Sequence, residues 1–182
     1  MKIYQGKTIK QIADEKGDDY FDTAVKLIVD GENNVDMSGF GMEEKSTEKI
    51  LAHPRVMISS DYGSHAPYPP MNKDIAHPRS YGTFPRAIAK YARERNICSL
   101  EEMIKKISSM PADKLGLKDR GRIEEGKAAD IVLFDYDKIQ DKATYTEPHQ
   151  YPEGIPYVIV NGEVVIKEGE HTGAFPGRVI RI

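Results

Sequence analysis

A short apolar run that ends on a carboxylate most constrains the fold of this chain. Residues 56–60 (VMISS) follow Pro54 and predict a short buried strand, and Asp61 stands directly at its carboxyl end. A loop then leads to Thr83, where a helix is expected to begin. In α/β barrel enzymes the catalytic groups stand at the carboxyl ends of the inner strands. The order of strand, acid, irregular loop and helix therefore predicts the last βα unit of such a barrel.

Helices and strands alternate through the first two thirds of the chain. Helical spacing and capping signals predict helices at about 8–17, 19–31, 43–52, 83–92, 99–107 and 111–116. Strands are expected at 35–40 and 56–60. Strands that alternate with helices favour parallel pairing. The sequence thus predicts the α/β class for residues 1–118.

The character of the chain changes near residue 118. Glycines become frequent from residue 119 onward, and apolar strand patterns at 129–135, 157–160 and 163–167 replace helices. The last two strands flank Asn161-Gly162, which is a strong hairpin signal. We therefore expect a second, β-rich part at 119–182.

Composition narrows the classes of function. The 182-residue chain has a net charge of -3 and a pI near 6.0, so it lacks the basic surface typical of nucleic-acid binding. Cys98 is the single cysteine, which excludes an internal disulfide and fits a reducing cytoplasm. The first residues lack an apolar signal segment, and runs such as 131–134 are far shorter than the about 20 residues that span a bilayer. We therefore expect a soluble cytoplasmic protein that binds neither nucleic acid nor membranes.

Asp61 and the loop after it hold the residues that could carry chemistry. Asp61 could act in catalysis, or it could bond backbone amides in an Asx turn. Arg79 offers a planar fork that suits a substrate carboxylate, and His77 could orient a ligand or transfer a proton. The alternative is that Arg79 pairs with an acid of the protein and His77 packs under the loop.

The remaining histidines give a weaker signal. His53 is expected to stabilise the carboxyl end of a helix, and His65 to be a solvated loop residue. His149 and His171 lie among turn residues and are interpreted as structural. The sequence contains no H-x-H, H-E-x-x-H or C-x-x-C motif, no G-x-S-x-G elbow and no P-loop. One aspartate and scattered histidines do not form a metal site of three or four ligands unaided.

Three segments of the chain carry a resemblance to a known family. Residues 119–135 (DRGRIEEGKAADIVLFD) resemble the closing signature of the amidohydrolase superfamily. Residues 53–61 (HPRVMISSD) and 77–86 (HPRSYGTFPR) narrow the resemblance to the N-acyl-D-amino-acid deacylases, also called D-aminoacylases. Residues 148–155 and 171–178 fit the same family. The match covers nearly the whole chain and resembles only the C-terminal third of family members.

The resemblance implies a fold and an activity. Residues 1–118 would be the last βα units of a metal-dependent hydrolase (β/α)8 barrel, and residues 119–182 part of a small β-sandwich. The full enzyme would use zinc to hydrolyse the amide of an N-acyl-D-amino acid, since zinc lowers the pKa of its bound water to about 7. Asp61 matches the aspartate that ends the last barrel strand, so the resemblance makes it both a metal ligand and the proton acceptor.

The same resemblance assigns the loop residues to the substrate. Arg79 would hold the substrate carboxylate, with His77 and Tyr81 lining the loop. Tyr62 departs from the family pattern, because glycine is expected at this position. A tyrosine there would narrow the pocket or alter the preference for the acyl group.

The resemblance also implies that this chain is incomplete by itself. The metal-binding H-x-H and further ligands of the family would lie before Met1, so we expect the isolated chain neither to hold zinc nor to hydrolyse substrate. Its expected partner is the missing N-terminal portion of the barrel or a second copy of the chain. One alternative is a non-catalytic assembly module, and another is a fragment of a dihydroorotase- or hydantoinase-like enzyme for cyclic amides. Residues 77–86 argue against the cyclic-amide alternative.

Overall fold

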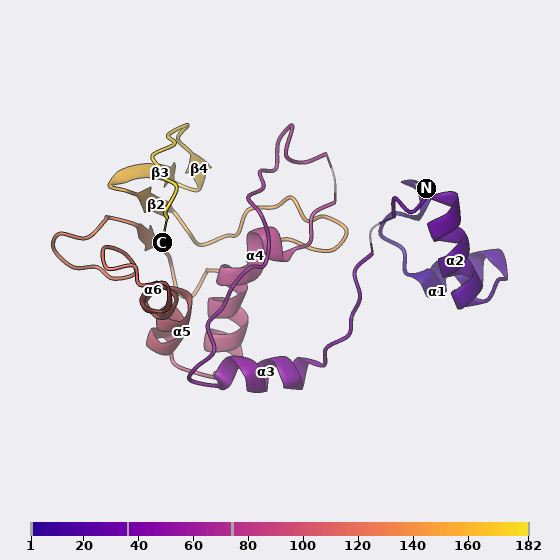
Figure 1. The fold of residues 1–182 in the computed structure, drawn as a ribbon, viewed down its shortest axis with the longest axis horizontal. Helices are drawn as coiled ribbons and strands as arrows, with labels where there is room; N and C mark the ends of the chain where they lie inside the picture. Colours follow the sequence, from indigo (N-terminus) through magenta and orange to yellow (C-terminus); the bar gives the residue numbers. More distant parts are fainter. Residues whose placement is uncertain (1, 36, 74, 182) are drawn as a thin grey trace. The chain divides into compact units, whose positions relative to one another are not determined.

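The computed structural model describes residues 2–35, 37–73 and 75–181. The chain divides into two compact units, Met1–Gly41 and Met42–Ile182. Figure 1 labels the helices and strands of both units. Within the described ranges, we find no helix with the length and apolar character that crossing a membrane would require.

The first unit is built on two short helices. A 3-10 turn, η1 (Lys2–Tyr4), precedes α1 (Ile9–Lys16) and α2 (Tyr20–Asp30) (Figure 1). The predicted capping box of α1 is confirmed, since the Gln11 N–H donates to Thr8 Oγ1 at 3.1 Å and the Thr8 N–H to Gln11 Oε1 at 2.7 Å. Gly17 ends α1 in the left-handed conformation, and Asp19 caps α2.

The apolar residues of α2 are divided between two sides of the helix. Thr23 and Leu27 are buried, as is Ile12 of α1. Phe21 and Val25, on another side of the helix, are exposed. The eight-residue α1 contributes only a narrow apolar contact, so it covers one side of α2 and leaves the other open.

The predicted strand at 35–40 does not form. Asp36 lies outside the described residues, and Val35 and residues 37–40 belong to no strand. A strand requires a hydrogen-bonded neighbour, and the described part of this unit contains none.

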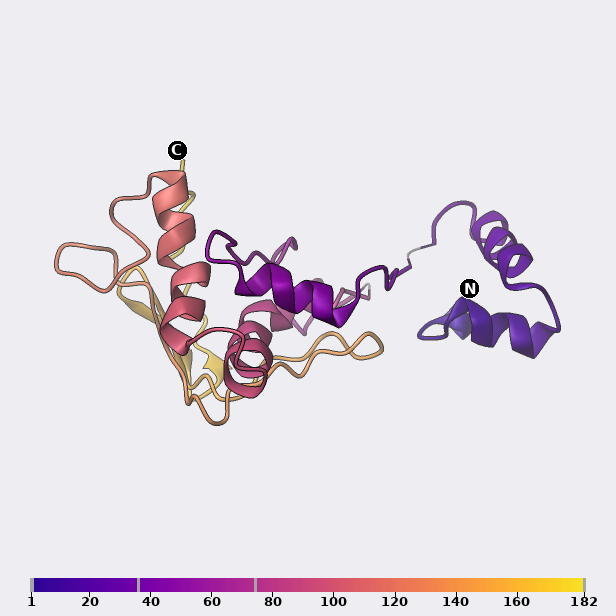
Figure 2. The ribbon, with the colours of Figure 1, turned by 90° about the horizontal axis from the view of Figure 1, so that it is seen from below.

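The second unit has a helical part and a sheet. Its helical elements are α3 (Glu44–Ala52), α4 (Arg79–Arg86), the π-helical η2 (Ala87–Glu94), α5 (Leu100–Ile107) and α6 (Ser109–Leu115). Ser99 caps α5 by accepting from the Glu102 N–H at 3.2 Å, and Gly116 ends α6 with φ of 73°. In Figure 2, α5 and α6 run nearly in line.

The helix after the long loop begins earlier than predicted. We expected Thr83 to cap it, but α4 begins at Arg79 and Thr83 lies inside it. The Thr83 hydroxyl donates to the Arg79 carbonyl at 2.8 Å, which is how a threonine satisfies itself within a helix. Pro85 lacks an N–H for the helical ladder, and the wider turns of η2 follow directly.

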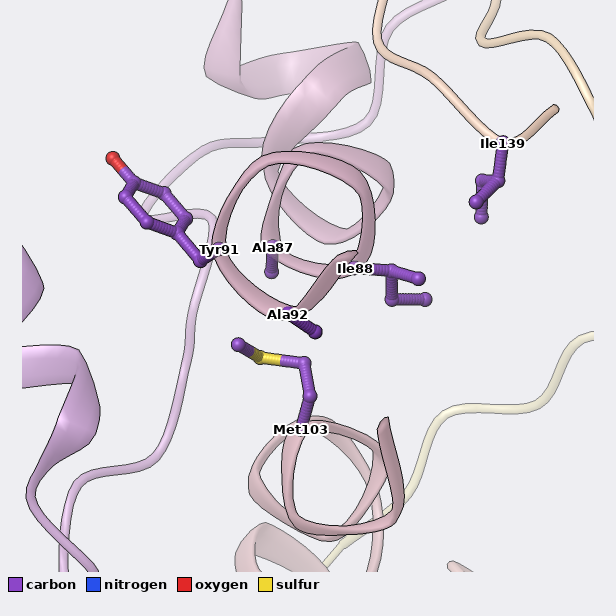
Figure 3. Packing of buried hydrophobic residues seen from close by; sticks show 6 residues of the cluster. All are labelled: Ala87, Ile88, Tyr91, Ala92, Met103 and Ile139. Atoms are coloured by element: carbon purple, nitrogen blue, oxygen red, sulfur yellow. The ribbon is translucent and has the colours of Figure 1, made fainter. Parts of the chain in front are cut away.

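The core of the second unit lies between η2, α5 and the segment that holds Ile139. Figure 3 shows Met103 of α5 directed toward Ala92 of η2, while Ile88 faces Ile139. Met103 and Ile139 are almost fully buried. This packing fixes the direction of the long α4–η2 helix, and α4 in turn carries the candidate site residues.

The predicted inner strand at 56–60 does not form, and the segment lies in no sheet. Its backbone is held by α5 instead, because the Ile58 N–H donates to the Lys106 carbonyl at 3.2 Å. The fully buried Lys106 ammonium donates to the carbonyls of His53 at 2.5 Å and Val56 at 3.3 Å. No parallel strand pair, and so no barrel, occurs in residues 2–35, 37–73 and 75–181.

The sheet is antiparallel throughout. Its strands β1 (Ile131–Leu133), β2 (Tyr157–Val160), β3 (Glu163–Lys167) and β4 (Glu170–His171) pair in chain order. The predicted hairpin is confirmed, with Asn161 and Gly162 at φ of 46° and 84° in the turn. The described residues form this one sheet, so a second layer of a sandwich is not among them. The domain boundary near residue 118 stays a prediction.

Candidate functional site

Asp61 stands at the start of the long loop that joins the extended segment to α4. Its backbone is left-handed, with φ of 49°, and its N–H donates to Ser59 Oγ at 3.3 Å. The carboxylate is 85% exposed and lies 3.1 Å from Nη2 of Arg79. The chain therefore brings together the two groups that the sequence singles out, but it does not enclose them.

Local hydrogen bonds position Arg79 at the start of α4. Its N–H donates to Nδ1 of His77 at 3.1 Å, and the Ser80 hydroxyl donates to the His77 carbonyl at 2.8 Å. Nε of Arg79 is buried and has no hydrogen-bond partner in the described part of the chain. A buried N–H without an acceptor is uncommon and costs free energy.

Tyr62 ties the beginning of the loop to its end. Its hydroxyl accepts a hydrogen bond from the His77 N–H at 3.4 Å. The Arg79 guanidinium lies over the Tyr62 ring, 5.4 Å from the ring centroid, and the His65 ring packs on the same tyrosine at 5.0 Å. His65 is thus half-buried against the loop, not the solvated residue that we expected.

His77 is held in its neutral form. Burial, and then the positive charge of Arg79, lowers the pKa of the His77 imidazole below its usual value of 6.5. Because Nδ1 accepts the hydrogen bond from Arg79, the neutral ring carries its proton on Nε2. The ring meets the edge of Tyr145 at 5.1 Å.

A second loop from the β-rich part reaches the site. Tyr81 Oη lies 3.1 Å from Nδ1 of His149, and the Tyr81 and Tyr151 rings meet edge to face at 6.1 Å. Figures 1 and 2 both show residues near 140–150 running beside the loop that precedes α4. Burial, and then neighbouring tyrosines, raises the pKa of both phenols, so they remain protonated hydrogen-bond donors at neutral pH.

The predicted site residues therefore separate into two neighbouring groups. Asp61 and Arg79 form one pair, with His77 bound to the backbone of the arginine. Tyr81 faces His149 instead. His149, which the sequence analysis interpreted as structural, thus lies beside a predicted site residue. The resemblance of residues 148–155 was the signal that could have found it.

Two other histidines have local structural roles. Nδ1 of His53 accepts the Arg55 N–H at 3.2 Å at the end of α3. His171 accepts the Gly173 N–H at 2.9 Å and packs against Phe175.

The described residues do not form a metal site. Across residues 2–35, 37–73 and 75–181, no group of three His, Cys, Asp or Glu side chains is arranged to hold a metal ion. Asp61, the predicted metal ligand, forms an ion pair with the Arg79 guanidinium. Its role as a ligand stays a prediction, and these residues alone do not fit zinc.

Comparison with known proteins places the chain in a family. Residues 8–166 match the model described as "Amidohydrolase family". The chain therefore belongs to the amidohydrolase family.

Several proteins similar to this chain are deacylases. A D-aminoacylase from Alcaligenes xylosoxydans xylosoxydans is 35% identical over 175 residues, which cover 96% of this chain and 34% of that protein. Among solved structures, a D-aminoacylase mutant in complex with CuCl2 matches with a TM-score of 0.77 and 32% identity, over 96% of this chain and 34% of the other. An N-acyl-D-glutamate deacylase from Bordetella bronchiseptica, complexed with zinc and a phosphonate mimic of the tetrahedral intermediate, matches with a TM-score of 0.70 and 31% identity, over 88% and 31%.

These relatives are considerably longer than this chain. The chain spans about a third of their length and corresponds to their C-terminal portion, as the resemblance implied. The relatives are hydrolases of linear amides, and structures of two of them contain zinc or copper. Their fold relates the chain to the barrel of this family, while its own described residues are a mixture of helices and one sheet.

Proposed function

We propose that this chain supplies an acid–base group and a carboxylate-binding arginine to the zinc-dependent hydrolysis of N-acyl-D-amino acids. The observation that carries the proposal is the Asp61–Arg79 pair at 3.1 Å, in a chain that belongs to the amidohydrolase family. The products would be a carboxylate and a D-amino acid. A cytoplasmic location is part of the same proposal.

Arg79 would bind the carboxylate of the substrate. Its guanidinium is a planar fork, and forks of this kind bind carboxylates through two parallel hydrogen bonds. Nη2 already holds a carboxylate, that of Asp61, and the buried Nε–H lacks an acceptor. A substrate carboxylate would take the place of the Asp61 carboxylate at Nη2.

Asp61 would carry the proton. Its carboxylate would accept a proton from the attacking water and pass it to the departing amine nitrogen, so that the C–N bond breaks as a C–O bond forms. The same carboxylate competes with the substrate for Arg79 in this structure. Binding of substrate would therefore release Asp61 to act at the amide.

The remaining walls of the site would come from the rest of the longer protein. The Asp61 carboxylate is 85% exposed, whereas an acid–base group works best in a site that excludes water. Zinc, which the resemblance implies, would need ligands from that portion as well, and we assign it no step here. We propose that the partner is this missing portion, with a second copy of the chain as the alternative.

Separate measurements of ligand binding and of turnover test the proposal. Binding of N-acetyl-D-leucine to the chain would be measured by calorimetry for the wild type, Asp61→Asn and Arg79→Gln. We expect Arg79→Gln to weaken binding about tenfold or more, since it removes a charge-assisted pair. We expect Asp61→Asn to tighten binding, because it removes the carboxylate that competes for Arg79.

Turnover would be measured after the missing portion is supplied. The chain would be combined with the N-terminal two thirds of the D-aminoacylase relative, and hydrolysis of N-acetyl-D-leucine would be followed with zinc present. Asp61→Asn should nearly abolish turnover, with zinc content largely unchanged. Substantial turnover by Asp61→Asn would contradict its acid–base role, and unchanged binding by Arg79→Gln would contradict the role of the arginine.

A further inference from the structure

We infer that Tyr62 is the residue that positions Arg79 for a carboxylate ligand. The guanidinium carbon lies 5.4 Å from the Tyr62 ring centroid, within the range of a cation–π contact. This inference rests on the proposed function, because it concerns the same arginine. It adds a residue that the family resemblance does not predict, since glycine is expected at this position.

The chain and two contacts hold the Tyr62 side chain in place. It follows Asp61 directly in the chain, its hydroxyl accepts the His77 N–H at 3.4 Å, and its ring packs on His65 at 5.0 Å. The ring therefore connects the carboxylate at the beginning of the loop with the arginine at its end. A side chain fixed in this way can hold its neighbour in one orientation.

The stacked geometry leaves the arginine free to bind. An aromatic ring covers one face of a guanidinium, while the N–H groups point outward in the plane of the fork. The edge that carries Nη2 is not covered by the ring, and Nη2 forms an ion pair with the Asp61 carboxylate at 3.1 Å. Because the ring already orders the long arginine side chain, a ligand loses less conformational entropy when it binds.

The same contact explains how the arginine stays beside its partner although it is partly exposed. The Arg79 side chain is 41% exposed, and exposed arginines usually sample several rotamers. Its backbone is fixed by α4, but the helix does not fix the guanidinium. Tyr62 supplies that constraint.

Nuclear magnetic resonance of the 182-residue chain tests the inference through the Nε–H signal of Arg79. The variants are Tyr62→Ala, which removes the ring, and Tyr62→Phe, which keeps the ring but removes the hydroxyl. Tyr68→Ala is the matched control, since this tyrosine lies on the same loop and hydrogen-bonds Tyr151 instead. N-acetyl-D-leucine is the binding probe, and the unfolding midpoint of each variant reports its stability.

We expect the wild type, Tyr62→Phe and Tyr68→Ala to keep a slowly exchanging Arg79 Nε–H signal. Tyr62→Ala should lose this signal, and its affinity for N-acetyl-D-leucine should fall about twofold to fivefold, the size of an exposed cation–π contact. A Tyr62→Phe variant that keeps the Arg79 Nε–H signal would support positioning by the ring.

The inference and the proposed function fail in different ways. An Arg79 signal that is unchanged in a folded Tyr62→Ala variant would overturn the inference, whatever the ligand does. A signal lost in Tyr62→Ala alone, with no variant binding N-acetyl-D-leucine, would support positioning by Tyr62 and count against the proposed function. Loss of the signal in Tyr68→Ala as well would overturn the inference, because the effect would belong to the whole loop.

Discussion

At the scale of a single residue, the pKa of His77 reports the burial and the positive charge around its ring. Its pKa is lowered first by burial and second by Arg79. We expect a proton titration of the folded chain, followed by nuclear magnetic resonance, to place the His77 pKa below 6.5. Arg79→Gln should raise it only part of the way, because burial remains. A wild-type His77 pKa at or above the usual histidine value would contradict the structure.

The lowered pKa of His77 also predicts how the free energy of unfolding changes with pH. At pH values above the His77 pKa in the unfolded chain, about 6.5, the ring is neutral in both the folded and the unfolded state. Its ionisation then does not change the free energy of unfolding. As pH falls through this value, the unfolded chain gains a proton that the folded chain resists, so the free energy of unfolding decreases. The decrease between about pH 7.5 and about pH 5 should be smaller in His77→Gln, measured by urea denaturation, and an equal decrease would contradict this linkage.

At the scale of elements, Lys106 holds segment 53–58 on α5. Its buried ammonium satisfies two carbonyls, those of His53 and Val56. Lys106→Met keeps the length of the side chain but removes the donor of the Val56 carbonyl and leaves the His53 carbonyl with only the Val56 N–H at 3.1 Å, so we expect a loss of about 1–3 kcal/mol in the free energy of unfolding. Urea denaturation measures this loss.

The neighbouring Lys105 provides the matched control. It is exposed on the same helix and makes only a surface pair with Glu102 at 3.7 Å. Lys105→Met should change the free energy of unfolding by less than about 0.5 kcal/mol. Equal effects of the two substitutions would mean that Lys106 does not anchor the segment.

Gly154 lets the backbone at this position pass close to the backbone of Ile139. Its φ is 78°, and an added Cβ would lie 2.5 Å from the Ile139 nitrogen, so the backbone there would have to move. Gly169 has a similar φ of 85° but open space around it. Gly169→Ala should therefore cost only the left-handed strain of about 1–2 kcal/mol, and Gly154→Ala considerably more.

Thermal unfolding of the two alanine variants measures this difference directly. Because both glycines have positive φ, the backbone strain is matched and the difference reports the close contact with Ile139. Equal losses in the two variants would show that residue 154 does not approach Ile139 so closely.

At the scale of the whole molecule, each unit leaves apolar surface uncovered. In the first unit, Phe21 and Val25 of α2 are exposed, and in the second, Val132 and Leu133 lie on β1, an outer strand of the sheet. Exposed apolar side chains on an edge strand favour association.

We therefore expect the isolated chain to show little or no hydrolysis of N-acetyl-D-amino acids, even with zinc added. The reason is that Asp61 is open to water and that the described residues contain no metal site. A colorimetric assay for the released amine measures this. Ordinary turnover by the purified chain, retained after gel filtration, would contradict the expectation.

The sequence by itself determined the local structure and the family. Capping at Thr8 and Asp19, the hairpin at Asn161-Gly162 and the resemblance of residues 119–135 all depend on neighbours in the chain, and the structure or the family match confirms them. Pairing of Arg79 with an unspecified acid of the protein was one of two alternatives, and the structure identifies that acid as Asp61.

Only the tertiary structure decided which elements found partners. Residues 56–60 had the pattern of an inner strand, yet they rest on α5, because a strand is completed by hydrogen bonds that another segment must supply. His149 reached Tyr81 across 68 positions of the chain, a contact that depends on how the second loop packs on the helical core. Short-range patterns fix conformation, whereas long-range packing fixes which side chains meet.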